Sequence, residues 1–454
     1  MYALGHELTH APTHKFDLGH MRVLLAGLGN PETRFASILI AGTNGKGSTA
    51  STLSSILQAS GLQTGLYTSP HLKRINERIR LNGESISNDD FALLHDVVGR
   101  TAERLVSEGD LPWHPSFFEM LTAMAFEYFA RNRPDMVVLE VGMGGRLDAT
   151  NVVDPQLSII TDISLDHQRF LGETIAEIAR EKAGIIRPKG VVITLPQLPE
   201  ANDVIGNTIL ELGARAVNAV PYVPPVSPAS PDYSAPRTQH LAKPAPRQCY
   251  PLEVLGQTIT VDSPLVGRHQ LRNVALSIAA AVELRERGFR QITAATIGRG
   301  IRETHWPGRF QVVSGAAYGS FRSQGSGHKP DYVFDVAHNP AGAWALRSTL
   351  SAYENRPVTI VFGVLRDKAM SEMAEILFPI AERVIVTHAN NPRSATPAEI
   401  RRAAFRVSAD IREAETVAEA LRMATESVGS GGLVVVTGSI YIVGEAMRTL
   451  DVRI

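Results

Sequence analysis

One lysine stands between glycines at residues 42–48 (GTNGKGS), directly after the short apolar run 38–41. Glycines lack a Cβ atom, so backbone N–H groups can converge there on phosphate oxygens, and the lysine adds a positive charge for the β- and γ-phosphates. A periodic segment from Ser48 to Ser60 follows, which predicts a helix whose N-terminus favours an anion. This order of strand, loop and helix predicts binding of nucleotide phosphates; the alternative is a tight turn that only joins a strand to a helix. The residues expected to hold the nucleotide are Thr43, Asn44, Gly45, Lys46, Gly47 and Ser48.

Further polar side chains follow the apolar run 136–139, which predicts a parallel strand buried on both faces, and the next predicted strand, residues 157–161. Glu140 ends the first run, and Asp166 and His167 come after the second. Ligands of open parallel sheets bind beyond the carboxyl ends of the strands, and Mg²⁺ prefers a carboxylate together with substrate phosphates. Glu140 is therefore a candidate magnesium ligand. Taken alone, the histidine is better explained as a satisfied polar residue near a strand end.

The phosphate loop departs from the strict pattern G-x-x-x-x-G-K-[ST], because Ile40 stands at the first glycine position and Gly47 at the last position. This form of the loop resembles the Mur ligase superfamily, and Gly47 makes it similar to the folate branch, the dihydrofolate synthases and folylpolyglutamate synthases. Motifs in the same order as in that branch follow at residues 68–72 (TSPHL), 77–80 (ERIR) and 181–186 (EKAGII). The resemblance implies an ATP-dependent carboxylate–amine ligase.

The resemblance also implies a metal site with two magnesium ions. The serine matching Ser69 helps to hold magnesium in these ligases. The lysine matching Lys182 is carbamylated there, which turns a cation without a lone pair into an oxygen ligand for the second ion. Without the resemblance, the lysine would lie on a solvated helix face, and residues 76–84 would form a polar surface loop with salt bridges. The implied metal ligands are Ser69, Glu140, His167 and Lys182; the implied cofactors are ATP and Mg²⁺, with K⁺ as a further cofactor to consider.

Residues 116–119 (SFFE) open a predicted helix, with Ser116 as its N-cap and Glu119 at the capping-box position. A capped helix with a buried phenylalanine explains this pattern by itself. The resemblance adds that the segment lies in the pterin pocket of the folate ligases. Residues 144–150 (GGRLDAT) resemble the version found where dihydropteroate is also accepted. The substrate-binding residues implied in this half are Ser116, Phe117, Phe118, Glu119, Leu147, Asp148 and Ala149.

A long apolar helix is predicted from Asn273 to Leu284, and the asparagine is either a plain helix-start residue or, by the resemblance, the residue that reads adenine. Residues 304–309 (THWPGR) predict a linker and resemble the hinge whose arginine, here Arg309, reaches an ATP phosphate.

Four apolar runs then alternate with helical segments, at residues 332–334, 358–362, 384–386 and 433–437. Polar residues after these runs resemble the glutamate-binding domain of the folate ligases. The resemblance implies Asp335 as a nucleotide contact, His338 and Ser439 as substrate contacts, and Lys46, Lys182 and His338 as the catalytic residues.

The predicted fold class is α/β with two doubly wound domains, an N-terminal P-loop ATPase-like domain and a smaller C-terminal Rossmann-like domain. The expected boundaries are residues 1–303 for the first domain, 304–309 for the hinge and 310–454 for the second domain. Residues 221–251 hold nine prolines, a density that sustains neither a helix nor a central strand, so we expect an extended, exposed excursion. Residues 314–329 are rich in Gly and Ser and predict a hairpin tip or an insertion. No chemistry is assigned to either stretch.

The composition excludes several classes of partner. Lys and Arg number 45 against 46 Asp and Glu in 454 residues, which leaves no global field that would attract nucleic acid or an acidic membrane. The single cysteine, Cys249, excludes an internal disulfide framework and fits a reducing compartment. No apolar run of spanning length and no signal segment is found, so the cytoplasm is expected. The expected partners are small molecules (dihydropteroate, reduced folates and L-glutamate), with neither nucleic acid nor membrane, and the expected oligomeric state is a monomer.

One motif has a competing meaning, because residues 6–10 (HELTH) match the zinc-protease pattern H-E-x-x-H. That pattern needs a helix long enough to place both histidines on one face, and Pro12 follows within two residues. The neighbours His14 and His20 are spaced like surface polar positions. We interpret the stretch as a capped N-terminal helix and loop.

The expected function is ATP-dependent ligation of L-glutamate to dihydropteroate and to the γ-carboxylate of reduced folates through an acyl phosphate. The alternatives are a folylpolyglutamate synthase without the first activity, another Mur-type amide ligase, and a nucleotide-binding regulator. Peptidoglycan ligases carry a complete nucleotide-sugar domain before the phosphate loop, and only 41 residues precede Gly42 here. A regulator would share the loop but would not need Glu140, His167 and Lys182.

Overall fold

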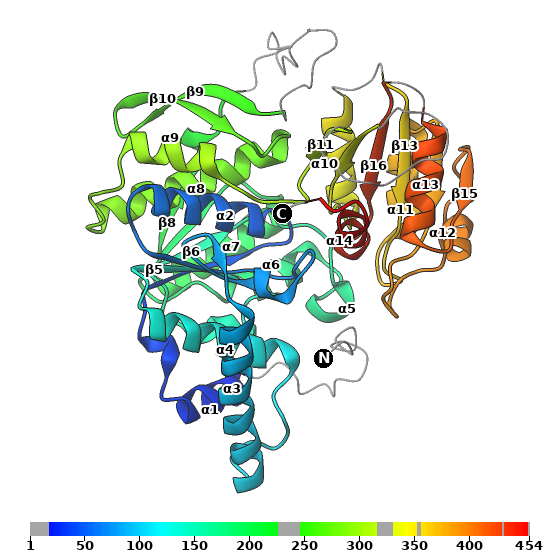
Figure 1. The fold of residues 1–454 in the computed structure, drawn as a ribbon. Helices are drawn as coiled ribbons and strands as arrows, with labels where there is room; N and C mark the ends of the chain where they lie inside the picture. Colours follow the sequence, from blue (N-terminus) through cyan, green and yellow to red (C-terminus); the bar gives the residue numbers. More distant parts are fainter. Residues whose placement is uncertain (1–17, 226–245, 316–329, 352–355, 429–430, 453–454) are drawn as a thin grey trace. The chain divides into compact units, whose positions relative to one another are not determined.

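The computed structural model describes residues 18–225, 246–315, 330–351, 356–428 and 431–452 (Figure 1). The chain divides into two compact units, and each is built on its own sheet. Unit 1 comprises Met1–Pro224, Cys249–Asp262 and Gln270–His305, and unit 2 comprises Pro225–Gln248, Ser263–His269 and Trp306–Ile454. The predicted fold class, α/β with two doubly wound domains, is confirmed.

Within its described residues, unit 1 holds an eight-stranded sheet in the order β4-β3-β2-β5-β1-β6-β7-β8. Neighbouring strands from β2 to β8 run parallel, and β3 and β4 continue the sheet antiparallel at one edge. The strands are β1 (Ser37–Ala41), β2 (Thr64–Tyr67), β3 (Ile79–Leu81), β4 (Glu84–Ser85), β5 (Met136–Glu140), β6 (Leu157–Ile160), β7 (Val191–Thr194) and β8 (Arg215–Asn218). Because β1 lies between β5 and β6, the loops that follow these three parallel strands leave the sheet at the same edge.

Alternate residues of the central strands pack into two different layers, as the strand period of two requires. In β1, Leu39 and Ala41 belong to one apolar core, and Ile38 and Ile40 belong to the other. The helices of the first layer are α1 (Leu18–Gly27), α3 (Asn88–Glu108), α4 (Phe117–Asn132), α6 (Ile175–Ala183) and α7 (Pro199–Leu212). Those of the second layer are α2 (Lys46–Ala59), α8 (Arg268–Glu286) and α9 (Ala294–Glu303). The central strands are therefore buried on both faces, which explains their continuous apolar sequences.

Two predictions about this half are corrected. Helix α8 begins at Arg268, so Asn273 lies within the helix and is not a helix-start residue. The Pro-rich stretch 221–251 is not extended throughout, because Pro221 lies in the short 3₁₀ helix η5 (Val220–Tyr222). Pro251 lies in β9 (Gln248–Val254), which pairs only with β10 (Gln257–Ser263) in the described structure, and an edge strand tolerates proline. The middle of the stretch lies outside the described residues.

Unit 2 holds a six-stranded sheet within its described residues, in the order β11-β12-β16-β13-β14-β15, with β11 antiparallel to β12 and the other neighbours parallel. The strands are β11 (Gln311–Val313), β12 (Asp331–Phe334), β13 (Val358–Phe362), β14 (Arg383–Val386), β15 (Ile411–Glu413) and β16 (Leu433–Thr437). The helices are α10 (Pro340–Leu350), α11 (Met370–Leu377), α12 (Pro397–Ala403), α13 (Val417–Ser427) and α14 (Ile440–Thr449). Val333 packs with α10 to α12, whereas the hydroxyl of Tyr332 lies 2.7 Å from that of Thr425 on α13, so helices cover both faces.

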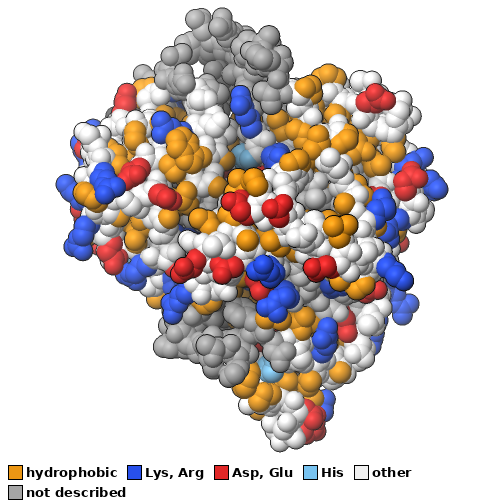
Figure 2. Space-filling model, turned by 180° about the vertical axis from the view of Figure 1, so that it is seen from behind, with side chains coloured by type: hydrophobic (Ala, Val, Ile, Leu, Met, Phe, Trp, Pro, Cys, Tyr) orange, Lys and Arg blue, Asp and Glu red, His pale blue; other side chains and the backbone are white. Residues whose placement is uncertain are grey.

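Lys, Arg, Asp and Glu side chains are interspersed on the face drawn in Figure 2, in agreement with the nearly balanced charge of the sequence. Among the described helices, none combines the length and the apolarity that crossing a membrane would require. The HELTH motif lies outside the described residues, as does the Gly/Ser-rich stretch beyond Gly315.

Candidate active site

The loop between β1 and α2 is shaped by two glycines at which a side chain would collide with a neighbour. A Cβ atom on Gly42 would lie 1.8 Å from the hydroxyl of Thr161, and one on Gly45 would lie 2.2 Å from the side-chain oxygen of Asn273. Gly45 also has a φ of 90°, a left-handed conformation that favours glycine, and it immediately precedes α2. The strand, loop and helix predicted here are confirmed, and the N-terminus of α2 points its N–H groups into the loop.

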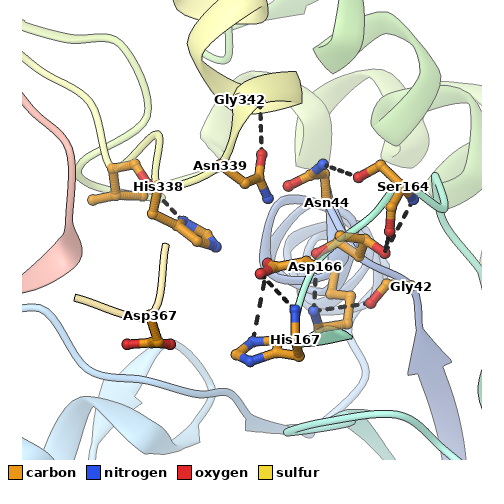
Figure 3. A network of polar contacts seen from close by, with 12 residues as sticks. Gly42, Asn44, Ser164, Asp166, His167, His338, Asn339, Gly342 and Asp367 are labelled. Carbon is orange, nitrogen blue, oxygen red and sulfur yellow. Dashed lines mark hydrogen bonds and ion pairs between the residues drawn. The ribbon is translucent and has the colours of Figure 1, made fainter. Parts of the chain in front are cut away.

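The segment that follows β6 holds this loop in place. The backbone N–H groups of Thr43 and Asn44 both donate to the carbonyl of Asp162, at 2.9 and 3.2 Å. The side chains of the same two residues donate to Ser164, Thr43 to its carbonyl and Asn44 to its hydroxyl, each at 3.0 Å (Figure 3). Arg272 on α8 donates from Nε and Nη2 to the carboxylate of Asp162. The loop is therefore positioned by two strand ends and one helix.

Sequence reasoning did not identify Asp162, Ser164 or Arg272. Asp162 directly follows the predicted strand 157–161, so its place at a strand end was a usable signal. Arg272 gave no local signal, because its partner lies 110 residues earlier in the chain.

Two lysines converge on the carbonyl of Gly42. Lys46 donates to it at 3.1 Å and to the carbonyl of Thr43 at 3.2 Å, and Lys182 donates to it at 2.9 Å. Burial lowers the pKa of Lys182 to about 7, and the positive charge of Lys46 acts in the same direction. Burial beside a second cation therefore favours the uncharged, nucleophilic form of Lys182 more than it is favoured in a solvated lysine.

Lys182 is 3% exposed, so the alternative that placed it on a solvated helix face is wrong. The loop after β5 covers this end of α6. The N–H of Arg146 donates to the carbonyl of Glu181 at 2.7 Å, and the amide of Asn151 donates to the carbonyl of Gly184 at 3.1 Å. A Cβ atom on Gly184 would lie 2.6 Å from the Cα of Arg146, so a glycine permits this close approach.

Acidic and polar side chains gather at the same sheet edge. Glu140 ends β5, is 4% exposed and accepts a hydrogen bond from the backbone N–H of Ser69 at 3.1 Å. Asp166 and His167 follow β6; the carboxylate of Asp166 accepts from the N–H of His167 at 2.9 Å and lies 3.9 Å from its ring Nε2 (Figure 3). Within the described residues, no three His, Cys, Asp or Glu side chains form a group that could hold a metal.

Asp148, an expected substrate contact, uses its carboxylate to build the loop in which it lies. Its oxygens accept from the N–H of Met143 at 2.9 Å and from the N–H and hydroxyl of Thr150 at 3.0 and 2.6 Å. Burial raises its pKa, and these hydrogen bonds oppose the rise. Leu147 and Ala149 flank this carboxylate in sequence, so Asp148 fixes the backbone that presents them.

The predicted capping box at the start of α4 is confirmed: Ser116 accepts from the N–H of Glu119, and Glu119 accepts from the N–H of Ser116. Glu119 also binds His20, with 3.1 Å between Oε1 and Nδ1, and the other ring nitrogen donates to the carbonyl of Trp113 at 3.0 Å. The interpretation of His20 as a surface position is therefore wrong, because it is 7% exposed. Burial alone would raise the pKa of Glu119, but the hydrogen bonds from His20 and Ser116 outweigh it, and the pKa lies below its usual value.

The stretch 76–84, interpreted alone as a polar surface loop, is instead folded into η3 (Ile75–Arg78), β3 and β4. Asn76 and Arg78 are buried, at 9% and 7% exposure. The guanidinium of Arg78 lies 5.4 Å above the centre of the Phe117 ring, and its Nε donates to Nδ1 of His71 at 3.1 Å. The next residue, Phe118, packs so closely that a Cβ atom on Gly142 would lie 2.5 Å from its ring.

In unit 2, Asp335 follows β12 and is 9% exposed. Burial raises its pKa, and the nearby charge of Arg309 opposes the rise. His338 donates from Nδ1 to the carbonyl of Val336 at 2.9 Å, which fixes its tautomer. Ser439 is the N-cap of α14 and accepts from the N–H of Ile442 at 3.3 Å. Figure 3 includes His338 and the next residue, Asn339, which is the N-cap of α10.

Comparison with known protein families shows to which family this chain belongs. A model of the Mur ligase middle domain matches residues 40–281, more than half of the 454 residues. The chain belongs to the Mur ligase family. A second model, the glutamate ligase domain of the Mur ligases, matches residues 308–440. The two matched regions contain the phosphate loop and the end of β12, respectively.

Several curated and solved relatives resemble this Mur ligase over nearly its whole length. It is 33% identical to the folylpolyglutamate synthase of Lacticaseibacillus casei over 434 residues, covering 95% of this chain and 94% of the relative. It is also 33% identical to the dihydrofolate synthase/folylpolyglutamate synthase of Bacillus subtilis over 439 residues, with 95% and 94% coverage. A structure of Mycobacterium tuberculosis folylpolyglutamate synthase with ADP and AMPPCP superposes with a TM-score of 0.82 at 32% identity, covering 96% of both chains. Escherichia coli FolC in complex with DHPP and ADP gives 0.81 at 30% identity, covering 99% of this chain and 96% of that chain.

Proposed function

We propose that this Mur ligase joins L-glutamate to dihydropteroate and to the γ-carboxylate of reduced folates, at the expense of ATP. The observation that carries the proposal is the arrangement at one sheet edge: a phosphate loop, a buried carboxylate (Glu140) and a buried lysine of lowered pKa (Lys182). The names of the relatives, which include both synthase activities, support the choice of substrates. A nucleotide-binding regulator would have no use for such a lysine.

The chemistry proceeds in two balanced steps. A carboxylate oxygen of the acceptor attacks the γ-phosphorus of ATP, the bond from that phosphorus to the β–γ bridging oxygen breaks, and ADP leaves. The amine of glutamate then attacks the carbonyl carbon of the acyl phosphate, loses a proton, and inorganic phosphate leaves as the amide forms. Lys46 and the N-terminus of α2 hold and neutralise the phosphates, which is the main demand of phosphoryl transfer.

The residues present fit a magnesium site only if oxygen donors beyond Asp and Glu take part. Glu140 supplies a carboxylate, Ser69 a hydroxyl, and Lys182 an oxygen if its uncharged amine has added carbon dioxide and lost a proton to form a carbamate. This oxygen-rich set, with His167 as the fourth residue, suits Mg²⁺. Bound there, magnesium would neutralise charge on the phosphate oxygens during transfer. K⁺ remains a further cofactor to test, and we assign no residue to it.

The remaining residues keep their expected roles in the proposal. We assign adenine recognition to Asn273, and further nucleotide contacts to Arg309 and Asp335. Glutamate binding is assigned to His338 and Ser439, and His338 is also assigned a catalytic role. Acceptor binding is assigned to residues 116–119 and 147–149. We further propose that the enzyme works as a monomer in the cytoplasm.

The test is glutamate-dependent ADP release by the purified full-length chain with ATP and Mg²⁺, with dihydropteroate in one reaction and tetrahydrofolate in another. Turnover with both acceptors is expected. Turnover with tetrahydrofolate alone would favour the second candidate, a folylpolyglutamate synthase without the first activity, and the name of the L. casei relative keeps that candidate open. Lys46→Ala should abolish release in both reactions. No release with either acceptor, together with intact ATP binding, would overturn the proposal.

A further inference from the structure

Arg78 is a buried cation whose contacts leave most of its donors unused. It is 7% exposed, its Nε donates to His71, and its Cζ lies 5.4 Å above the centre of the Phe117 ring. Its side-chain hydrogen bonds to the described residues run through Nε alone, so Nη1 and Nη2 donate to none of them. A guanidinium carries five N–H donors, and burying a charge without a partner is costly.

No carboxylate of the described residues forms an ion pair with this guanidinium. The carboxylate nearest in sequence, on Glu77, is engaged elsewhere, because it accepts from the backbone N–H groups of Leu72, Lys73 and Arg74 at 2.8, 2.9 and 2.5 Å. Glu77 thus shapes the turn and leaves the arginine without a counter-ion from its own segment. A buried charge of this kind is balanced when a ligand supplies the opposite charge.

The position of Arg78 points to the acceptor as that ligand. Its carbonyl accepts from the N–H of Thr68 at 3.0 Å, directly before Ser69. Phe117, on which the guanidinium lies, is one of the proposed acceptor-binding residues. Arg78 therefore connects the segment proposed to hold metal with the segment proposed to hold the acceptor.

We infer that Arg78 binds a carboxylate of the acceptor substrate, with His71 and Phe117 holding the guanidinium in place. Nη1 and Nη2 form a fork that matches the two oxygens of a carboxylate, a geometry that a lysine cannot reproduce. His71 accepts from Nε through Nδ1 and so restricts rotation of the fork, and the aromatic face restricts its tilt. The inference rests on the proposed function, because it names the part of the proposed acceptor that this site recognises.

The test compares two ligands that differ only in this charge: dihydropteroate and its carboxamide. Their dissociation constants are measured by calorimetry on the full-length chain with Mg²⁺ and AMPPCP. The wild type should bind the acid roughly 10–100-fold more tightly than the amide, the range expected for hydrogen bonds to a charged group. Arg78→Gln should lose that factor for the acid and keep the affinity for the amide, and Arg78→Lys should recover part of it.

Arg74→Gln is the matched control, because Arg74 lies in the same turn but is exposed and donates to Asn88. It should behave as the wild type. Equal affinity of the wild type for acid and amide would overturn the inference, and that measurement does not depend on any variant folding. An Arg78→Gln protein that loses both ligands equally would also overturn it, since that pattern indicates a purely structural role. Absence of glutamate-dependent ADP release from the wild type with every acceptor would instead refute the proposed function.

Discussion

Lys182 combines three properties that rarely occur together in a lysine: burial, a pKa lowered to about 7, and a position against the phosphate loop. If its carbamate is a magnesium ligand, Lys182→Ala should reduce turnover by more than roughly 100-fold, because loss of a ligand costs more than loss of an outer-shell partner that only orients one. Short carboxylic acids such as acetate should restore part of the activity by supplying the missing oxygens. The measurement is glutamate-dependent ADP release with and without added acetate.

The control for this experiment is Arg180→Ala, which removes an exposed cation from the same helix. It should retain wild-type activity and show no response to acetate. A Lys182→Ala protein that remains active and does not respond to acetate would contradict the carbamate.

Glu119 gives a prediction on pH at the same scale. Its pKa is lowered in the folded protein, so the carboxylate stabilises the fold above its ordinary value of 4.5, and this contribution is lost as the pH falls through the lowered pKa. Glu119→Gln should therefore cost about 1.5–3 kcal/mol of unfolding free energy at neutral pH, the range for hydrogen bonds to a charged group. The difference from the wild type should shrink as the pH falls below 4.5. Urea unfolding at a series of pH values measures it.

The comparison for Glu119 is Glu108→Gln, which removes an exposed partner of Arg104 on α3. An exposed pair of this kind contributes about 0–1 kcal/mol, so this variant should follow the wild type at every pH. If Glu119→Gln and Glu108→Gln gave the same pH profile, the buried contact with His20 would carry no stability.

At the scale of elements, one glycine lies before α2 and another lies after it. Substituting each in turn distinguishes the effect of backbone strain from the effect of displacing the phosphate loop. Gly45 and Gly61 have φ values of 90° and 82°, so alanine at either position should cost roughly 1–2 kcal/mol through backbone strain alone. Only at Gly45 would the new Cβ also collide, at 2.2 Å from the side-chain oxygen of Asn273; at Gly61 no atom lies within 4 Å. Gly45→Ala should therefore also lower kcat/KM for ATP by roughly 100-fold through misplacement of the loop.

Gly61→Ala should leave kcat/KM for ATP unchanged while showing a similar loss of stability. Steady-state kinetics and thermal unfolding of the two variants provide the comparison. An equal loss of kcat/KM in both would mean that strain in α2, and not the contact between the loop and Asn273, governs nucleotide use.

The elements that carry the site were predictable because their causes are local. Continuous apolar runs at residues 38–41, 136–139 and 433–437 belong to strands buried on both faces, and such runs occur for few other reasons. The strands β8 and β15 left no comparable pattern, since they are largely exposed and polar at the sheet edges. Sequence pattern therefore predicted the centre of each sheet better than its edges.

Contacts between distant residues limited what could be predicted about the site. His20 meets Glu119 across 99 positions, and Lys182 meets Gly42 across 140, so neither burial could be read from its own helix. The lysine lies in an amphipathic segment, and its side chain reaches the carbonyl of Gly42 in the phosphate loop, far away in the sequence. The positions of strand ends in the sequence therefore identified candidate residues. Their burial and hydrogen-bond partners depended on tertiary packing and could not be predicted.

At the scale of the whole molecule, unit 1 has two apolar cores, one on each face of its sheet, and unit 2 has a core made of other residues, which leads to a prediction about how the chain unfolds. Ile159 and Ile360 are both fully buried on central strands, Ile159 in unit 1 and Ile360 in unit 2. Replacing either by valine removes one methylene group and should cost about 0.5–1.5 kcal/mol. Domains with separate cores can unfold separately, so calorimetry should resolve two transitions.

Ile159→Val should lower the transition that ADP and Mg²⁺ raise, because the phosphate loop lies in unit 1, and Ile360→Val should lower the other. A single transition lowered equally by both variants would mean that the two units unfold as one cooperative structure.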